Sequence, residues 1–298
     1  MSSTFGSFNT VRLGIYAAQK GLDVTGNNIT NINTAGYTRQ RLDQVSLITS
    51  ASDRYYSPYK TRVGQGVLTT GVSQLRDPGL DIAYRNASAD VGAADAKLAG
   101  LEKLASILDE VGKGDGEQDD GVLLNQLNDL RDLINKAITS GLDSTQEGLI
   151  RASAKALCSL FNDAADKLAD MTETWETQLK DQVDTVNNIL TSLRDLNISI
   201  RDADIRGDAA LELRDQRNLL LDQLSQYMDI DVKYEMEDVG AGLMVEKMTV
   251  TLGTGGKDTL VDGKYATKLE TGDATKGYLI SLHPLQDKTG NKHPQAPN

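Results

Sequence analysis

Few residues of this chain have the type and spacing that metal binding or phosphate binding needs. Residues 115–120 are rich in carboxylates, but an EF-hand loop starting at Asp115 would place Gly at position 120 and Glu at 126, where the chain has Asp120 and Gln126. The glycine-rich residues 253–257 end in a lysine that is followed by Asp258, whereas a phosphate-binding loop needs Ser or Thr there. We interpret the first segment as a solvated acidic loop and the second as a hairpin turn.

The residues that could act as nucleophiles or bases are equally sparse. Cys158 is the single cysteine, and both histidines, His283 and His293, lie near the end of the sequence. A His-dependent triad or a multi-His metal site therefore has almost nothing to draw on. Because Cys158 lies beside an apolar helical stripe, we expect it to be a buried structural thiol. The sequence predicts no catalytic residue, no metal, no cofactor and no enzyme activity.

Composition and charge exclude further classes of protein. The 298 residues carry 43 acidic and 31 basic side chains, a net charge of −12, and only 5% aromatic residues. Nucleic-acid backbones are bound by clustered Lys and Arg, so we expect no nucleic-acid partner. No stretch approaches the roughly 18 apolar residues of a membrane span. The first residues lack the basic and apolar regions of a cleavable signal peptide, so none is expected.

The first 36 residues show the strongest periodic pattern. Apolar or small residues follow one another in steps of three or four, as in a heptad seam that faces another helix: Phe8, Val11, Ile15, Ala18, Leu22, Thr25, Ile29 and Ile32. Glycines at 14, 21 and 26 weaken this helix by about 1 kcal/mol each. We therefore expect a coiled-coil-type helix that forms when it acquires partners. The alternative is an ordinary core helix of a globular domain.

The rest of the chain predicts a mainly α protein with a smaller β part. Residues 37–80 read as an extended or β-hairpin segment, residues 81–229 as an elongated antiparallel bundle of long helices, and residues 230–298 as a partial β domain with a polar tail. Ser144 and Glu147 have the spacing of a capping box that opens the longest helix. Trp175 occupies a heptad position of that helix, so we expect it in the core.

Two N-terminal runs resemble a known family. The run AQKGLDVTGNNI at residues 18–29, followed by NTAGYTRQ at residues 33–40, is similar to the N-terminal signature of bacterial flagellar axial proteins, which comprise rod, hook and hook-associated proteins. The pairing of GNNI with GYTRQ resembles the hook-associated members most. Downstream, DPGLDIAYRN at 77–86, ASAKALCSLFN at 152–162 and LRDQRNLLLDQLS at 213–225 continue the resemblance.

The resemblance implies a structural adaptor that joins the flagellar hook to the filament. It implies export through the flagellar type III apparatus with an export chaperone, self-association in a ring, and contacts with the hook protein and the second junction protein outside the cell. The residues expected at the assembly interface lie in the N-terminal signature: Phe8, Val11, Ile15, Ala18, Gln19, Leu22, Asn27, Asn28, Ile29, Ile32, Gly36, Tyr37 and Arg39. Among these, the amides of Gln19, Asn27 and Asn28 could fix the register between subunits.

Two alternatives stay open beside the adaptor. The chain could be another flagellar axial subunit of the rod or hook, or a cytosolic coiled-coil adaptor that never polymerises. Family members end in a long amphipathic helix, whereas residues 289–298 are polar and carry Pro and Gly. We therefore expect a truncated member of the family.

Overall fold

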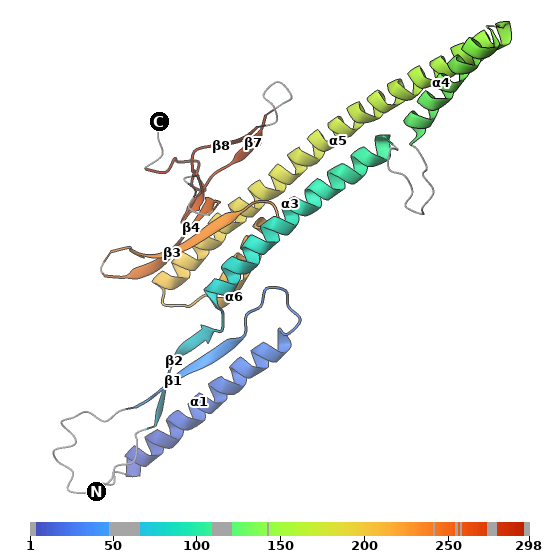
Figure 1. The fold of residues 1–298 in the computed structure, drawn as a ribbon. Helices are drawn as coiled ribbons and strands as arrows, with labels where there is room; N and C mark the ends of the chain where they lie inside the picture. The colour runs from blue at the N-terminus through green and yellow to red at the C-terminus, as the bar shows by residue number, and fades with distance from the viewer. Residues whose placement is uncertain are drawn as a thin grey trace. The chain divides into compact units, whose positions relative to one another are not determined.

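The computed structural model describes residues 4–47, 66–108, 121–141, 143–240, 242–253, 256, 258–272 and 279–294 (Figure 1). Its residues belong to two compact units. The first unit contains Met1–Ser88, Asn188–Lys268 and Leu282–Asn298, and the second contains Ala89–Asn187 and Leu269–Ser281. Helices dominate and the sheets are small, which confirms the prediction of a mainly α protein with a smaller β part.

The first unit begins with a helix laid against a hairpin (Figure 1). Helix α1 (Thr4–Thr30) contacts both β1 (Gln40–Ser46) and β2 (Val67–Gln74), which pair antiparallel with a register shift between Asp43 and Gln44. Both strands lie within residues 37–80, the segment that was predicted to be extended or a β-hairpin. The helix is already formed within the single chain, whereas the sequence pattern had indicated a helix that forms only with partners.

The remainder of the first unit packs helices against a four-stranded sheet. The sheet has the order β3 (Ile230–Asp238), β4 (Met244–Leu252), β5 (Thr259–Asp262) and β6 (Tyr265–Ala266), all antiparallel. Its core combines side chains from the sheet, from the C-terminal part of α5 (Ser144–Ile205) and from α6 (Leu211–Leu224). The largest fully buried ones are Leu190, Leu193, Ile200, Leu221, Leu224, Met248 and Leu260.

The second unit is built from long helices with a small hairpin. It contains most of α3 (Pro78–Leu108), all of α4 (Val122–Ser140) and the N-terminal part of α5. A short connection turns α4 back along α5, and the Gln126 amide donates to the Ser153 hydroxyl at 3.0 Å. The short strands β7 (Leu269–Thr271) and β8 (Ile280–Leu282) form a two-stranded sheet.

The start of α5 departs from the predicted capping box. The helix does begin at Ser144, but the Asp143 carbonyl accepts the Glu147 N–H at 2.9 Å, so the chain enters the helix one residue earlier than predicted. The Glu147 carboxylate pairs with Arg151 at 2.6 Å. Consequently this carboxylate supports the helix surface one turn ahead.

Two predictions of burial are wrong. Cys158 is exposed, because its neighbours Leu157 and Leu160 are the half-buried positions of this turn and Cys158 points about 100° away from Leu157 around the helix. Trp175 is 42% exposed, because its ring lies over Gly100 of α3 beside an open groove of about 1050 Å³. The acidic residues 115–120 lie outside the described residues, as do Thr254, Gly255 and Lys257 of the glycine-rich turn.

Candidate assembly interface

Helix α1 presents two different apolar faces. The inner face lies on the hairpin, where Ala17 is 4% exposed and Leu13 and Val24 are half-buried. The outer face carries the predicted seam, whose large apolar side chains are 59–73% exposed: Phe8, Val11, Ile15, Leu22 and Ile29, with Ala18 exposed among them. The last seam residue, Ile32, lies in the turn after α1 and is 78% exposed. The hairpin therefore covers one side of the helix and leaves the seam open.

The open seam is a surface suited to association. Fully burying one large aliphatic side chain gains about 1.5–3 kcal/mol, and a continuous exposed apolar stripe on a soluble protein commonly marks an interaction site. The seam residues recur at steps of three and four, which is the spacing of residues that pack between two helices. The arrangement can thus bind another helix without any change to the contacts that α1 already makes with the hairpin.

Asparagines at the C-terminal end of α1 and just after it tie this helix to the first strand. Asn28 makes a two-point contact with the backbone of Gln40: its Nδ2 donates to the Gln40 carbonyl at 2.9 Å, and its Oδ1 accepts the Gln40 N–H at 2.8 Å. Asn27 Nδ2 donates to Gln40 Oε1 at 3.4 Å, and Asn31 Nδ2 donates to Asn27 Oδ1 at 2.8 Å. The structure thus uses these amides within the chain, and Gln19 lies exposed on α1. Their place at a subunit interface stays a prediction.

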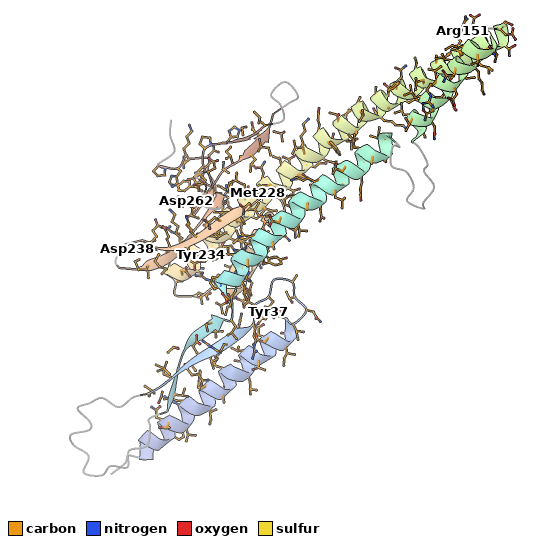
Figure 2. The ribbon with its side chains drawn as sticks, in the orientation of Figure 1. Tyr37, Arg151, Met228, Tyr234, Asp238 and Asp262 are labelled. Carbon is orange, nitrogen blue, oxygen red and sulfur yellow. The ribbon has the colours of Figure 1, made fainter. Side chains whose placement is uncertain are left out.

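Gly36 and Tyr37 lie where the chain leaves α1 for β1. Gly36 has a φ of +78°, and a Cβ added there would lie 3.0 Å from Leu219 Cβ of α6, so both the backbone and the space require glycine. Figure 2 labels Tyr37. Its hydroxyl donates to Asn28 Oδ1 at 2.9 Å. Burial and the nearby carboxylate of Asp215 raise the pKa of Tyr37, which therefore stays a neutral hydrogen-bond donor.

The side chain of Arg39 is exposed, and its neighbour Thr38 makes the longer-range contact. The Thr38 N–H donates to Asp215 Oδ2 at 3.1 Å across 177 residues of sequence. The contact joins the GYTRQ run to the DQRN run, two segments that resemble the same family. Sequence reasoning missed Asp215, although an acidic residue one helical turn from both Leu211 and Leu219 on a short helix was a signal for it.

A buried ion cluster holds α6 to the sheet behind these contacts. Arg217, 3% exposed, pairs with Glu246 at 2.6 Å and stacks over the Tyr234 ring at 5.0 Å, while Arg214 approaches Glu246 at 2.5 Å. Burial opposes ionisation of Glu246, but Arg217 and then Arg214 outweigh it and lower its pKa. Both carboxylate oxygens of Glu246 are paired with an arginine, and these ion pairs join α6 to β4, whereas the buried Arg217 Nε has no hydrogen-bond partner among the residues that the structure describes.

The described part of the chain offers little for chemistry. Within it no group of three or more His, Cys, Asp or Glu side chains could hold a metal ion. None of its helices is both long enough and apolar enough to cross a membrane. The groove beside Trp175 is open and bordered by Gly100, Met171 and Lys167.

Comparison with protein families gives two matches. Residues 116–296, more than half of the chain, match the family model of the flagellar hook-associated protein FlgK helical domain. Residues 9–38 match the model of the flagella basal body rod protein, which covers most of α1 and the turn after it.

Curated relatives carry one name. Flagellar hook-associated protein 1 of Bacillus subtilis is 30% identical over 275 residues, which are 89% of this chain and 52% of the relative. The proteins of that name from Escherichia coli and Salmonella typhimurium are 24% and 25% identical over 76% and 88% of this chain, and 39% and 43% of their own lengths are covered. The chain thus spans about half or less of the length of these relatives.

A solved structure, that of the flagellar hook junction protein FlgK from Burkholderia pseudomallei, is 19% identical to this chain with a TM-score of 0.49. The likeness covers 72% of this chain and 34% of the FlgK chain.

Proposed function

Since the chain belongs to the family of the flagellar hook-associated protein FlgK, we propose that it is a structural adaptor at the junction of the flagellar hook and the filament. Its role is mechanical rather than enzymatic. The curated relatives from Bacillus subtilis and Escherichia coli bear the name of a flagellar hook-associated protein, which supports a place beside the hook.

The observation that carries the proposal is the open seam of α1. Its inner face is occupied by the hairpin, while Leu22, Ile29 and the other seam residues remain exposed. A protein that joins two tubular assemblies needs such an unsatisfied surface on every copy, and head-to-tail contacts between unlike surfaces build rings or helical arrays. We assign Phe8, Val11, Ile15 and the remaining predicted interface residues to these contacts.

The partners follow from this position in the flagellum. The chain contacts other copies of itself in a ring, the hook protein on one side and the second junction protein on the other. It reaches this place outside the cell by export through the flagellar type III apparatus, assisted by an export chaperone. The low intrinsic helix preference of the α1 segment, with Gly14, Gly21 and Gly26 inside it, suits a chain that passes a narrow channel unfolded.

Immunogold electron microscopy of flagella from the source cells tests the proposal. The antibody is raised against residues 80–230, and the expected result is label confined to a narrow band between hook and filament. Label confined to the cytoplasm of cells that carry normal flagella would refute the assembly role and favour a cytosolic coiled-coil adaptor.

A second candidate is a rod or hook subunit. The match of residues 9–38 to the rod protein model favours it, because the same N-terminal segment occurs in several axial proteins. The same experiment separates the two, since label along the rod or hook would keep the axial role and change the location.

A further inference from the structure

One face of α6 contacts Gly36, Thr38 and Gln40, where the chain passes from α1 into β1. Three residues at steps of three and four make these contacts and lie on one stripe of the helix, namely Glu212, Asp215 and Leu219, and Asp222 continues that stripe. Gln40 Nε2 donates to Glu212 Oε1 at 3.5 Å, and the Thr38 N–H donates to Asp215 Oδ2. Gly36 lies directly against Leu219.

The order of these contacts shows that residues 36–40 run antiparallel to α6. Gly36 lies at Leu219, Thr38 at Asp215 and Gln40 at Glu212, so every second residue of the connection meets the helix. Two residues of extended chain advance about 6.6 Å, close to the 5.4 Å of one helical turn. Residues 36, 38 and 40 thus meet three successive turns of α6.

Asp215 is the most constrained member of the stripe. It is 6% exposed, and a buried carboxylate is costly unless hydrogen bonds compensate it. Its Oδ2 accepts the Thr38 N–H, while its Oδ1 has no hydrogen-bond partner among the residues that the structure describes. An Asp at this position is therefore explained by its bond to the connection, because a leucine would satisfy the neighbouring core without the cost of a buried charge.

The contacts continue from the connection into α1. Gln40 is buried, and its backbone N–H and carbonyl are both bonded to the side chain of Asn28 near the C-terminal end of α1. Fixing residues 36–40 on α6 consequently fixes the last turn of α1. Arg85 and Arg76 reinforce the end of the stripe through Asp222, at 2.9 and 3.7 Å.

We propose that Asp215 is a positioning residue that sets the direction in which α1 leaves α6. Its carboxylate locks the register of residues 36–40 on the α6 stripe, and Asn28 passes that register to α1. The consequence for assembly, that the open seam is held at one angle, rests on the proposed function. The positioning itself is a property of the isolated chain.

Double electron–electron resonance on the isolated chain tests the positioning. Spin labels are attached to Lys20→Cys on α1 and Gln223→Cys on α6, both exposed positions, in a chain whose native cysteine is replaced by Cys158→Ser. The parent chain should give one narrow distance distribution. Asp215→Leu should make the distribution about twice as broad, because the connection can then slide and α1 samples several directions.

Three variants make the result specific. Asp215→Asn keeps an acceptor oxygen and should restore the narrow distribution, and Gln216→Leu, an exposed neighbour on the same helix, should leave it unchanged. Asp215→Ser, whose hydroxyl is too short to reach Thr38, repeats the test if Asp215→Leu does not fold. In the variants with a broadened distance distribution, the sheet should melt at the same temperature as in the parent chain.

A narrow distribution in folded Asp215→Leu or Asp215→Ser would overturn the proposal, as would broadening in Gln216→Leu to the same extent. Immunogold label away from the hook–filament junction would refute the proposed function and leave this result intact. The two failures are therefore distinguishable.

Discussion

Replacing Leu22 by Asp should impair assembly while leaving the stability of the isolated chain almost unchanged. The Leu22 side chain is 73% exposed in the middle of the seam, so the substitution removes few contacts within the chain. Exposed substitutions of this kind change the free energy of unfolding by less than about 0.5 kcal/mol. We expect Leu22→Asp to leave the urea unfolding curve of the isolated chain almost unchanged.

The effect on association should be much larger. Burying a leucine side chain gains about 1.5–3 kcal/mol, and most of that gain is still available because the side chain is exposed before assembly. A carboxylate at the same place adds a desolvation penalty of at least about 1 kcal/mol. The two effects together cost at least about 2.5 kcal/mol. Since 1.4 kcal/mol corresponds to about tenfold in affinity, the binding affinity at one seam contact should fall by roughly 50-fold or more.

The assay is filament formation in the source bacterium, with the variant gene in place of the native one. Flagellar filaments are counted by electron microscopy, and Leu22→Asp cells should lack them. Tyr16→Asp is the matched control: Tyr16 is 62% exposed on the same helix, but the helical period places it about 120° away from Leu22. We expect Tyr16→Asp cells to carry normal filaments.

Ala17→Asp gives the complementary result. Ala17 is buried against the hairpin, so an acid there should detach α1 and lower the stability of the isolated chain as well. The reasoning would be refuted if Leu22→Asp cells carried normal filaments, or if Tyr16→Asp abolished them equally.

Three further predictions concern the isolated chain. Gly36→Ala should lower the free energy of unfolding by about 1–3 kcal/mol, because an alanine would adopt a φ of +78° and its methyl carbon would meet Leu219; urea unfolding measures this. Glu246 is ionised in the folded chain although burial opposes it, because Arg217 lowers its pKa below the ordinary 4.5. Its contribution to stability is therefore complete above about pH 4.5 and is lost as the pH falls through the lowered value, so Glu246→Gln should flatten that part of a pH series of unfolding curves. Cys158 is exposed, so it should react fully with Ellman's reagent in the native chain.

Each of these has an opposite outcome. A Gly36→Ala chain as stable as the parent would show that the turn can relax without glycine. An acid unfolding profile unchanged by Glu246→Gln would mean that the cluster contributes no pH-dependent stability. Substoichiometric labelling of Cys158 in the native chain would restore the prediction of a buried thiol.

Sequence periodicity predicted the helix faces and strands, because these depend on residues that are close together in the sequence. The seam residues follow the helical period closely enough that the pattern alone assigned Leu22 and Ile29 to one face, and the structure places that face away from the hairpin. The β part predicted from residue 230 likewise begins with β3, in which Ile230 and Val232 alternate with charged residues along the strand. In both cases the residues that decide the structure are neighbours in sequence.

What could not be predicted depends on distant partners. The inner face of α1, with Ala17 at its centre, has no pattern of its own that identifies a hairpin as its cover. The bond between Thr38 and Asp215 spans 177 residues, and the spacing of either segment carries no information about the other. Cys158 was misassigned for a related reason, because a stripe of apolar neighbours does not say which side of the helix meets α4.

The matched pitch between residues 36–40 and α6 has a consequence for insertions and deletions. One residue added between Gly36 and Gln40 would turn Thr38 away from the helix, because successive residues of an extended chain point to opposite sides. Two added residues would restore the alternation and move α1 along α6 by about one turn. Insertions between Gly36 and Gln40 should therefore be tolerated as pairs of residues and not as single residues.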